Sequence, residues 1–433
     1  MPFNYLKTHD LTLFGADSTP CVEITGTKKK TCRYCRGLIM RFSQLTDRVA
    51  GEGAAAWDLH VEALTQKRAG KDVIILSIGD PDLDTPAAIT EEAVRLLRAG
   101  DTHYADILGL PRAREAVAAQ HSRTTGQKVT VDNVAIMSGC QSGLFAVAMT
   151  ILDPGDEAVV LEPMYVTYEA TIQASGAKLV RVPLKAANNF RLDISDLAKA
   201  ITPKTRAIFF ATPSNPTGVT LNRAELEGIA ALARKHDLWV VADEVYSTLI
   251  FDGEHISICG LDGMAERTAT VSSLSKSHAM TGWRFGWVVG PKTLIDHCGN
   301  LGLANLYGLP PFIQNASAMA LEQDVPEVEE MREIYRHRRD MAVKALGQLP
   351  GIVCRSPAAG MFMLADVRGT GMTGHDFSWA LFRATGVATL DATAFGPSAE
   401  GHIRISFAID EISLTEACQR IADFTRKLME KVA

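Results

Sequence analysis

Lys276 lies between small hydroxyl residues in the stretch 271–290, which reads VSSLSKSHAMTGWRFGWVVG, and Arg284 follows it. Burial and a nearby cation can lower the pKa of a lysine amine, so that the amine attacks a carbonyl at neutral pH. The stretch therefore fits chemistry in which a lysine forms a Schiff base. A Ser-Leu-Ser-Lys tetrapeptide alone is more often part of a solvated loop, so a functional role for Lys276 depends on the residues around it.

Polar residues follow three apolar runs that read as strands. The sequence NPTG, from Asn215, follows run 207–210, the sequence DEVY, from Asp243 to Tyr246, follows run 239–242, and Ser273 and Lys276 follow run 268–271. Any one of these segments alone is typical of a turn or a helix start. Ligands of parallel sheets bind at the carboxyl ends of the strands, so three such segments at successive strand ends predict one site.

The elements that position this site are short apolar runs alternating with helical patterns. Such alternation is typical of βαβ units, and predicts an α/β protein with a mostly parallel seven-stranded sheet covered by helices on both faces. The seven runs are 134–137, 158–161, 179–182, 207–210, 239–242, 268–271 and 285–289.

The pattern changes after about residue 310, which predicts a domain organisation. Two long helical patterns and strand-like pieces at 361–367 and 402–407 indicate a smaller α+β domain over 311–433. We expect a large domain over 81–310, an N-terminal segment 40–80 that joins the small domain, and a poorly ordered extension over 1–39. Ser413 and Glu416 predict a capping box for the last helix.

Composition and charge exclude several classes of protein. The chain has 433 residues, of which 47% are hydrophobic, and 44 basic against 50 acidic residues give a net charge of −6. This balance argues against a nucleic-acid-binding protein. Without a long apolar run, we expect no membrane span and a cytoplasmic location. Eight scattered cysteines, with only Cys32 and Cys35 as a C-x-x-C pair, predict neither a disulfide framework nor a metal site.

Taken together, these motifs resemble a known family. From about Met40 to the C-terminus the chain resembles the class I/II aminotransferases of the aspartate aminotransferase fold, on the combination of NPTG, DEVY, SLSK and GWR. The resemblance implies the fold of type I transferases that depend on pyridoxal 5′-phosphate. It also implies a homodimer with active sites at the subunit interface, acting on an amino acid and a 2-oxo acid.

The resemblance assigns catalytic roles to Lys276, Asp243 and Tyr246 and a cofactor-binding role to Asn215. Lys276 matches the lysine that binds the cofactor aldehyde and moves the proton between the substrate Cα and the cofactor. Asp243 matches the partner of the pyridine nitrogen, and Asn215 and Tyr246 match the residues that hydrogen-bond the phenolic oxygen of the cofactor. Asn215 also borders the substrate position.

Other matching residues concern the cofactor phosphate. Ser273 and Arg284 match phosphate ligands, and the backbone of Gly139 and Cys140 begins a helix whose amides suit the same phosphate. Family members often have another residue at Cys140, so its backbone rather than its side chain is implied. Tyr104 matches a tyrosine that reaches the phosphate of the neighbouring subunit.

The remaining matches concern the ring and the substrate. Tyr165 matches the aromatic residue that stacks on the cofactor ring, although a core tyrosine would read the same way. Arg404 matches the arginine that binds the substrate α-carboxylate through two hydrogen bonds. Gly79 matches a backbone position that lines the same site.

Longer stretches resemble bacterial members of the family that transfer the amino group of L-arginine to pyruvate. A guanidinium needs a carboxylate or an aromatic face, and Trp57 and Asp58 lie in a segment that lines the substrate pocket in the family. The simpler interpretation is that Trp57 is an aromatic residue of the core and Asp58 a charge on the surface. Two alternatives remain open: an aminotransferase with another amino donor (aspartate, alanine or an aromatic amino acid), and a lyase on the same fold. A transcription regulator would need a DNA-binding module, which the 39 residues of the expected N-terminal extension do not provide.

Overall fold

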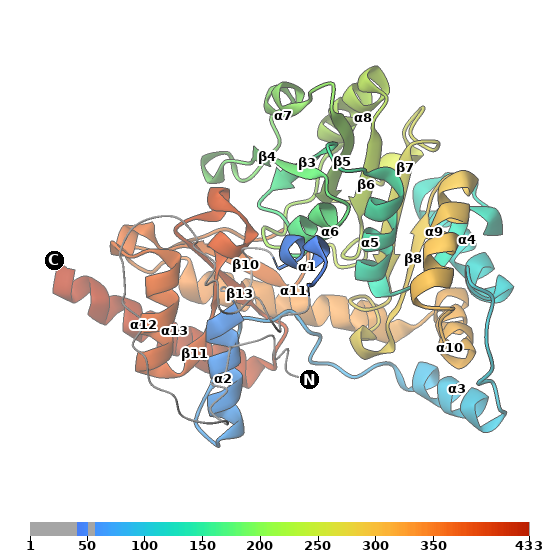
Figure 1. Cartoon of the computed structure of the whole chain (residues 1–433). Helices are drawn as coiled ribbons and strands as arrows, with labels where there is room; N and C mark the ends of the chain where they lie inside the picture. Colours follow the sequence, from blue (N-terminus) through green and yellow to red (C-terminus); the bar gives the residue numbers. More distant parts are fainter. Residues whose placement is uncertain (1–40, 51–56, 433) are drawn as a thin grey trace, which may run out of the picture.

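The computed structural model describes residues 41–50 and 57–432, and over these residues the chain forms a seven-stranded sheet flanked by helices (Figure 1). All seven predicted strands are present, so the predicted α/β fold with a mostly parallel sheet is confirmed. Only β8 runs antiparallel to its neighbours. The order across the sheet is β2 (Val134–Ser138), β8 (Phe285–Val289), β7 (Thr268–Ser273), β6 (Trp239–Asp243), β5 (Thr205–Ala211), β3 (Glu157–Glu162) and β4 (Lys178–Pro183).

Both faces of this sheet are buried, which explains the continuous apolar runs. Along β5, Phe209 packs in the hydrophobic cluster that includes Leu144, whereas the adjacent Ile208 packs in a different cluster with Leu226. Successive side chains of a strand point to opposite faces, so each face needs its own layer of helices. The helices α5 (Gly139–Ile151) and α8 (Arg223–His236) belong to these two layers.

The C-terminal part contains a second sheet that faces the first. Its order is β12 (Leu390–Asp391), β13 (His402–Ser406), β10 (Phe362–Asp366) and β9 (Val353–Cys354), all antiparallel. β1 (Ile74–Ile75) pairs in parallel with β11 (Val387–Ala388), which holds the segment before Gly79 against the C-terminal part. The domain boundaries stated above stay a prediction, and the expected extension at 1–39, with Cys32 and Cys35, lies outside the described residues.

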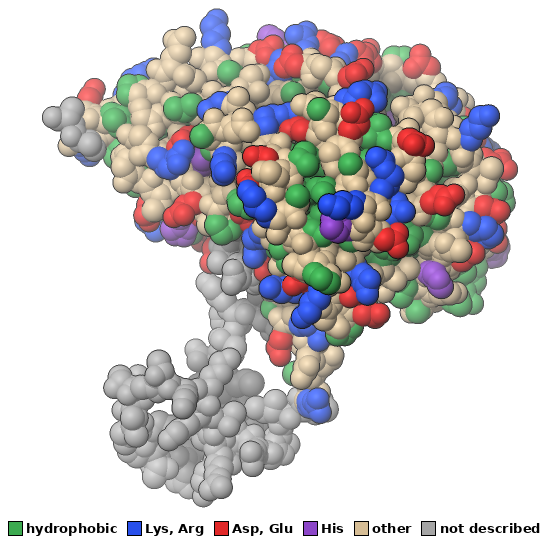
Figure 2. All heavy atoms as spheres, turned by 90° about the horizontal axis from the view of Figure 1, so that it is seen from above, with side chains coloured by type: hydrophobic (Ala, Val, Ile, Leu, Met, Phe, Trp, Pro, Cys, Tyr) green, Lys and Arg blue, Asp and Glu red, His purple; other side chains and the backbone are tan. Residues whose placement is uncertain are grey.

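Helices complete both layers, and α11 extends between the two sheets in Figure 1. On the face in Figure 2, basic and acidic side chains are interspersed. Within the described residues, no helix is long and apolar enough to span a membrane. The remaining helices are α1 (Gln44–Arg48), α2 (Asp58–Arg68), α3 (Ala87–Arg98), α4 (Pro111–Thr125), α6 (Tyr168–Ala174), α7 (Ile194–Ala200), α9 (Lys292–Asn305), α10 (Pro311–Glu322), α11 (Pro326–Leu346), α12 (Gly374–Thr385) and α13 (Glu411–Val432).

The start of α13 differs from the predicted capping box. The helix begins at Glu411, and Asp410 Oδ1 accepts a hydrogen bond from the backbone N–H of Ser413 at 2.9 Å. Ser413 is therefore the third residue of the helix and not its cap. This hydrogen bond also lowers the pKa of the Asp410 carboxyl group. An aspartate accepts this bond as well as a serine does, and its charge adds a favourable interaction with the helix dipole.

Replacing Asp410, the observed cap, should therefore lower stability, whereas replacing Ser413, the predicted cap, should not. We expect Asp410→Ala to lower the free energy of unfolding by about 1 kcal/mol, as is usual for the loss of an N-cap. The midpoint of thermal unfolding, followed by circular dichroism, measures this change. Ser413→Ala is the matched control, and a larger destabilisation by Ser413→Ala than by Asp410→Ala would contradict the assignment.

Candidate active site

Lys276 lies in the turn that follows β7, and its amine points toward the turn after β1. Its Nζ donates a hydrogen bond to the carbonyl oxygen of Gly79 at 2.6 Å. Burial lowers the pKa of this amine to about 8, and the positive charges of Arg404 and Arg284 act in the same direction. The negative charge of Asp80 opposes them. A large fraction of the Lys276 amine is therefore neutral near pH 8, as a nucleophile requires.

Asp243 ends β6 and is 4% exposed. Its carboxylate accepts hydrogen bonds from Tyr168 Oη at 2.9 Å, from the Val245 N–H at 3.2 Å and from Cys140 Sγ at 3.5 Å. Burial raises the pKa of Asp243, while these three donors favour the ionised form. No lysine, arginine or histidine pairs with Asp243 in the described residues, so the carboxylate can accept a cationic group from a ligand.

Arg404 lies on β13 and is 3% exposed. One guanidinium nitrogen donates to Asn215 Oδ1 at 3.0 Å and the other to the Ser77 carbonyl at 2.7 Å. The rings of Phe362 and Phe395 lie with their centroids 4.2 and 4.9 Å from Cζ.

The guanidinium of Arg404 keeps an unused donor. Its Nε is buried and has no hydrogen-bond partner in the described part of the chain. Burial lowers the pKa of the guanidinium to about 10. Because both of its acceptors are neutral oxygens, the group keeps its full positive charge available for a carboxylate.

Gly139 opens α5 opposite the guanidinium of Arg284. Gly139 has a φ of +77°, and a Cβ at this position would lie 2.2 Å from Arg284 Nη2. Arg284 donates to the Thr281 carbonyl at 2.7 Å, which holds the guanidinium beside the first amides of α5. The hydroxyl of Ser273, on neighbouring β7, is buried. A helix N-terminus beside an arginine is a favourable place for a phosphate or another anion.

Tyr165 and Tyr246 form the aromatic part of the site. The Tyr165 ring lies edge-on to Tyr168 with centroids 5.9 Å apart, and Tyr246 lies edge-on to Phe362 at 6.1 Å. Burial raises the pKa of Tyr165 and of Tyr246, so each keeps its hydroxyl proton. Both can therefore donate a hydrogen bond at neutral pH.

The structure thus brings most of the predicted residues together, and the exceptions are Trp57, Asp58 and Tyr104. Trp57 is half-buried, and its ring packs edge-on against His60, whose Nδ1 lies 2.8 Å from Ser77 Oγ. Asp58 is exposed in the first turn of α2. Tyr104 is 86% exposed and packs against the ring of Tyr307.

Sequence patterns missed two residues of the site. Tyr168 donates to Asp243, and the carboxylate of Asp80 acts on the Lys276 amine. Tyr168 is the first residue of α6, three positions after Tyr165, so the spacing Y-x-x-Y just before this helix was the signal available for it. Asp80 follows Gly79 directly, but nothing in the local sequence shows that this turn faces Lys276.

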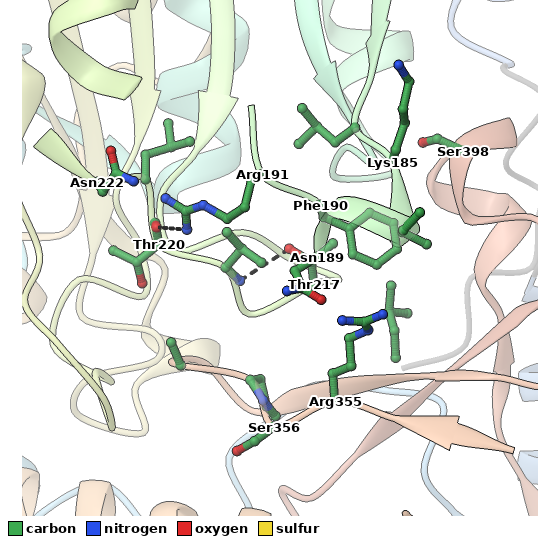
Figure 3. A pocket seen from close by; sticks show the side chains of 18 of the residues that line it. Lys185, Asn189, Phe190, Arg191, Thr217, Thr220, Asn222, Arg355, Ser356 and Ser398 are labelled. Carbon is green, nitrogen blue, oxygen red and sulfur yellow. Dashed lines mark hydrogen bonds between the residues drawn. The ribbon is translucent and has the colours of Figure 1, made fainter. Parts of the chain in front are cut away.

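A large cleft lies elsewhere in the described part of the chain. It has a volume of about 1170 Å³ and runs between the segment after β4 and the segment after β9. Figure 3 shows Phe190, Thr217 and Arg355 in its walls. None of the predicted site residues lines this cleft, so its size alone does not locate the chemistry.

Comparisons with known proteins agree with this geometry. A family model described as aminotransferase class I and II matches residues 71–421. The arginine–pyruvate transaminase AruH of Pseudomonas aeruginosa is 51% identical over 88% of this chain and 98% of its own length. The aspartate aminotransferase of Pyrococcus abyssi is 38% identical over 82% of this chain and 92% of its own length. The structure of an aspartate aminotransferase from Thermus thermophilus with maleate superposes with a TM-score of 0.84 at 34% identity, covering 89% of this chain and all of that one.

The lowered pKa of Lys276 is open to a direct test. In the cofactor-free protein, reductive methylation of Lys276 by formaldehyde should be half-maximal near pH 8, because only the neutral amine reacts. Exposed lysines should respond about two pH units higher. Peptide mass spectrometry measures each site separately.

Asp80→Asn provides the control for this test, since removal of its negative charge should move the midpoint of Lys276 to lower pH. If Lys276 instead titrates together with the exposed lysines, burial does not activate it.

Proposed function

The chain belongs to the class I and II aminotransferases, enzymes that use pyridoxal 5′-phosphate, and we propose that it transfers the amino group of L-arginine to pyruvate. The products of this reaction are 5-guanidino-2-oxopentanoate and L-alanine. The observation that carries the substrate assignment is the 51% identity to an arginine–pyruvate transaminase along nearly its whole length, against 38% to an aspartate aminotransferase.

The residues of the site fit the cofactor. Gly139 has no side chain and so lets the Arg284 guanidinium lie beside the first amides of α5, which suits a phosphate. The buried Asp243 carboxylate, without a cationic partner in the described residues, suits a protonated ring nitrogen, and the lysine with a lowered pKa suits an aldehyde. We propose that Arg284, Ser273 and the amides of Gly139 and Cys140 hold the phosphate. Pyridoxal phosphate supplies an aldehyde that takes up the amino group and a ring that delocalises the electron pair left at Cα.

The side chains of the protein then perform the remaining tasks. Lys276 would take the proton from the substrate Cα and deliver it to the cofactor, because its amine is neutral in a useful fraction of molecules near pH 8. Asp243 holds a proton on the ring nitrogen, and its donors Tyr168 and Cys140 fix the orientation of the carboxylate. Tyr165 would cover the ring face, and Asn215 and Tyr246 would hydrogen-bond the phenolic oxygen.

Arg404 orients the substrate. We propose that its guanidinium binds the α-carboxylate, with Gly79 lining the same space, and that the buried Nε adds a donor to this contact. Trp57 is supported as part of the side-chain pocket by its contact with His60, whose pKa is lowered by burial and by the charge of Arg404. The contact of Asp58 with the substrate guanidinium stays a prediction.

We also propose a homodimer. Tyr104, which the family pattern assigns to the neighbouring active site, is largely exposed and lies beside the half-exposed ring of Tyr307. An exposed aromatic pair favours a protein contact. A cytoplasmic location likewise stays a prediction from the sequence.

The substrate proposal is tested by a survey of single amino acids. Without an acceptor, the cofactor-loaded protein should convert one equivalent of L-arginine per active site into its 2-oxo acid, faster than aspartate, alanine or an aromatic amino acid. Added pyruvate should restore turnover and yield L-alanine, which chromatography measures. Faster conversion of another amino acid would leave the aminotransferase assignment intact and replace arginine as the donor.

The role of Arg404 predicts a second result. Arg404→Ala should raise the KM of every amino acid about a hundredfold, because a charge-assisted, bidentate contact is lost, while the cofactor stays bound. Steady-state kinetics and the visible absorbance of the bound cofactor provide the two measurements. Arg420→Ala, on α13, is the matched control, since Arg420 contacts Asp72 and Glu416 outside the site. An unchanged KM in Arg404→Ala would remove the assignment.

A further inference from the structure

Glu162 is a buried carboxylate between the two sheets that the proposed mechanism does not use. It ends β3 and is 2% exposed. Its Oε1 accepts a hydrogen bond from the Ser398 N–H at 2.9 Å, and its Oε2 lies 3.0 Å from Arg181 Nε in an ion pair. A buried carboxylate is costly unless its partners are well placed, so this arrangement fixes the positions of the partners as much as that of the acid.

The carboxylate of Glu162 fixes one particular loop of the C-terminal sheet. The backbone N–H of Met164 donates to the Phe395 carbonyl at 2.9 Å, next to the bond from Ser398. Between them, Gly396 has a φ of +117°, and a Cβ there would lie 2.2 Å from Glu162 Cδ. The segment 395–398 therefore packs directly on the end of β3 and has no room for a side chain at position 396.

The same loop reaches the substrate arginine. The Phe395 ring is fully buried, and its centroid lies 4.9 Å from Arg404 Cζ, which also contacts the Phe362 ring at 4.2 Å. The loop follows β12, in which Leu390 pairs with Arg404 itself. A guanidinium that contacts two rings keeps one orientation only while both rings are held in place. Phe362 is part of β10, whereas Phe395 depends on the loop that Glu162 anchors.

We propose that Glu162 is a positioning residue for substrate binding, which sets the orientation of Arg404 through Phe395. This inference rests on the proposed binding of the substrate α-carboxylate by Arg404. Glu162 itself touches neither substrate nor cofactor in this arrangement. Loss of the anchor should therefore weaken the binding of any α-amino acid more than it slows the chemical step.

The test compares two variants that disturb the contact from its two sides. Glu162→Ala should raise the KM for the amino donor about tenfold with kcat changed less than about threefold, because one buried charged contact is lost and the reacting groups stay in place. Gly396→Ala should raise KM in the same way, since the new methyl group displaces the carboxylate. Glu162→Gln, which keeps an acceptor for the Ser398 N–H, should recover part of the affinity.

Two controls separate positioning from general damage. Arg181 has a second carboxylate partner, since its Nη2 lies 3.3 Å from Glu169 Oε1. Glu169→Gln removes the charge of this partner and should leave KM unchanged. Gly371→Ala places a methyl group at a φ of +76° with nothing within 4 Å, so it adds backbone strain without a clash. Thermal unfolding of every variant shows whether the fold is retained.

The outcomes are distinct. An unchanged KM in both Glu162→Ala and Gly396→Ala would overturn the proposal, and so would a rise of equal size in Glu169→Gln. If Glu162→Ala does not fold, the comparison of KM between Gly396→Ala and Gly371→Ala tests the positioning role by itself. If KM rises in Arg404→Ala but not in the Glu162 variants, only the positioning role of Glu162 is rejected. If KM is unchanged in Arg404→Ala, the proposed binding of the substrate α-carboxylate by Arg404, on which the positioning role rests, is rejected.

Discussion

The guanidinium of Arg404 is the constraint on which the arrangement of the two sheets depends. It is buried, and in the described residues it contacts two neutral oxygens and two aromatic rings but no carboxylate. A buried charge without a counter-charge lowers stability, so the surrounding structure must compensate for it. The compensation comes from several elements: Asn215 follows β5, Ser77 follows β1, and Phe362 and Phe395 belong to the C-terminal part.

Burial acts on the other charged groups of the site in opposite directions. It lowers the pKa of the Lys276 amine and raises that of the Asp243 carboxyl group, so burial disfavours the charged form of each group before a ligand arrives. A cofactor with a phosphate and a cationic ring would return counter-charges to Arg284 and Asp243. The site is therefore complementary in charge to an anionic, nitrogen-containing ring compound, and groups perturbed in this way cluster at functional sites.

Much of this arrangement was predictable from sequence because parallel strands buried on both faces give continuous apolar runs. Asn215, Asp243 and Lys276 follow such runs, and their convergence follows from the shared edge of the sheet. The two-residue strands β9, β11 and β12 are too short to produce a pattern. Asp410 was missed as a cap because the sequence contains two plausible caps three residues apart, and only tertiary packing decides where α13 begins.

Three glycines explain why the charged groups could be placed so closely. A Cβ would lie 1.9 Å from the Phe362 ring at Gly79, 2.2 Å from the Arg284 guanidinium at Gly139 and 2.2 Å from the Glu162 carboxyl carbon at Gly396. Each of these neighbours carries or orients a charge of the site. A longer side chain at any of the three positions would push a backbone segment away from the group it positions. The precision of the site therefore depends on backbone segments that approach side chains closely, which only glycine allows.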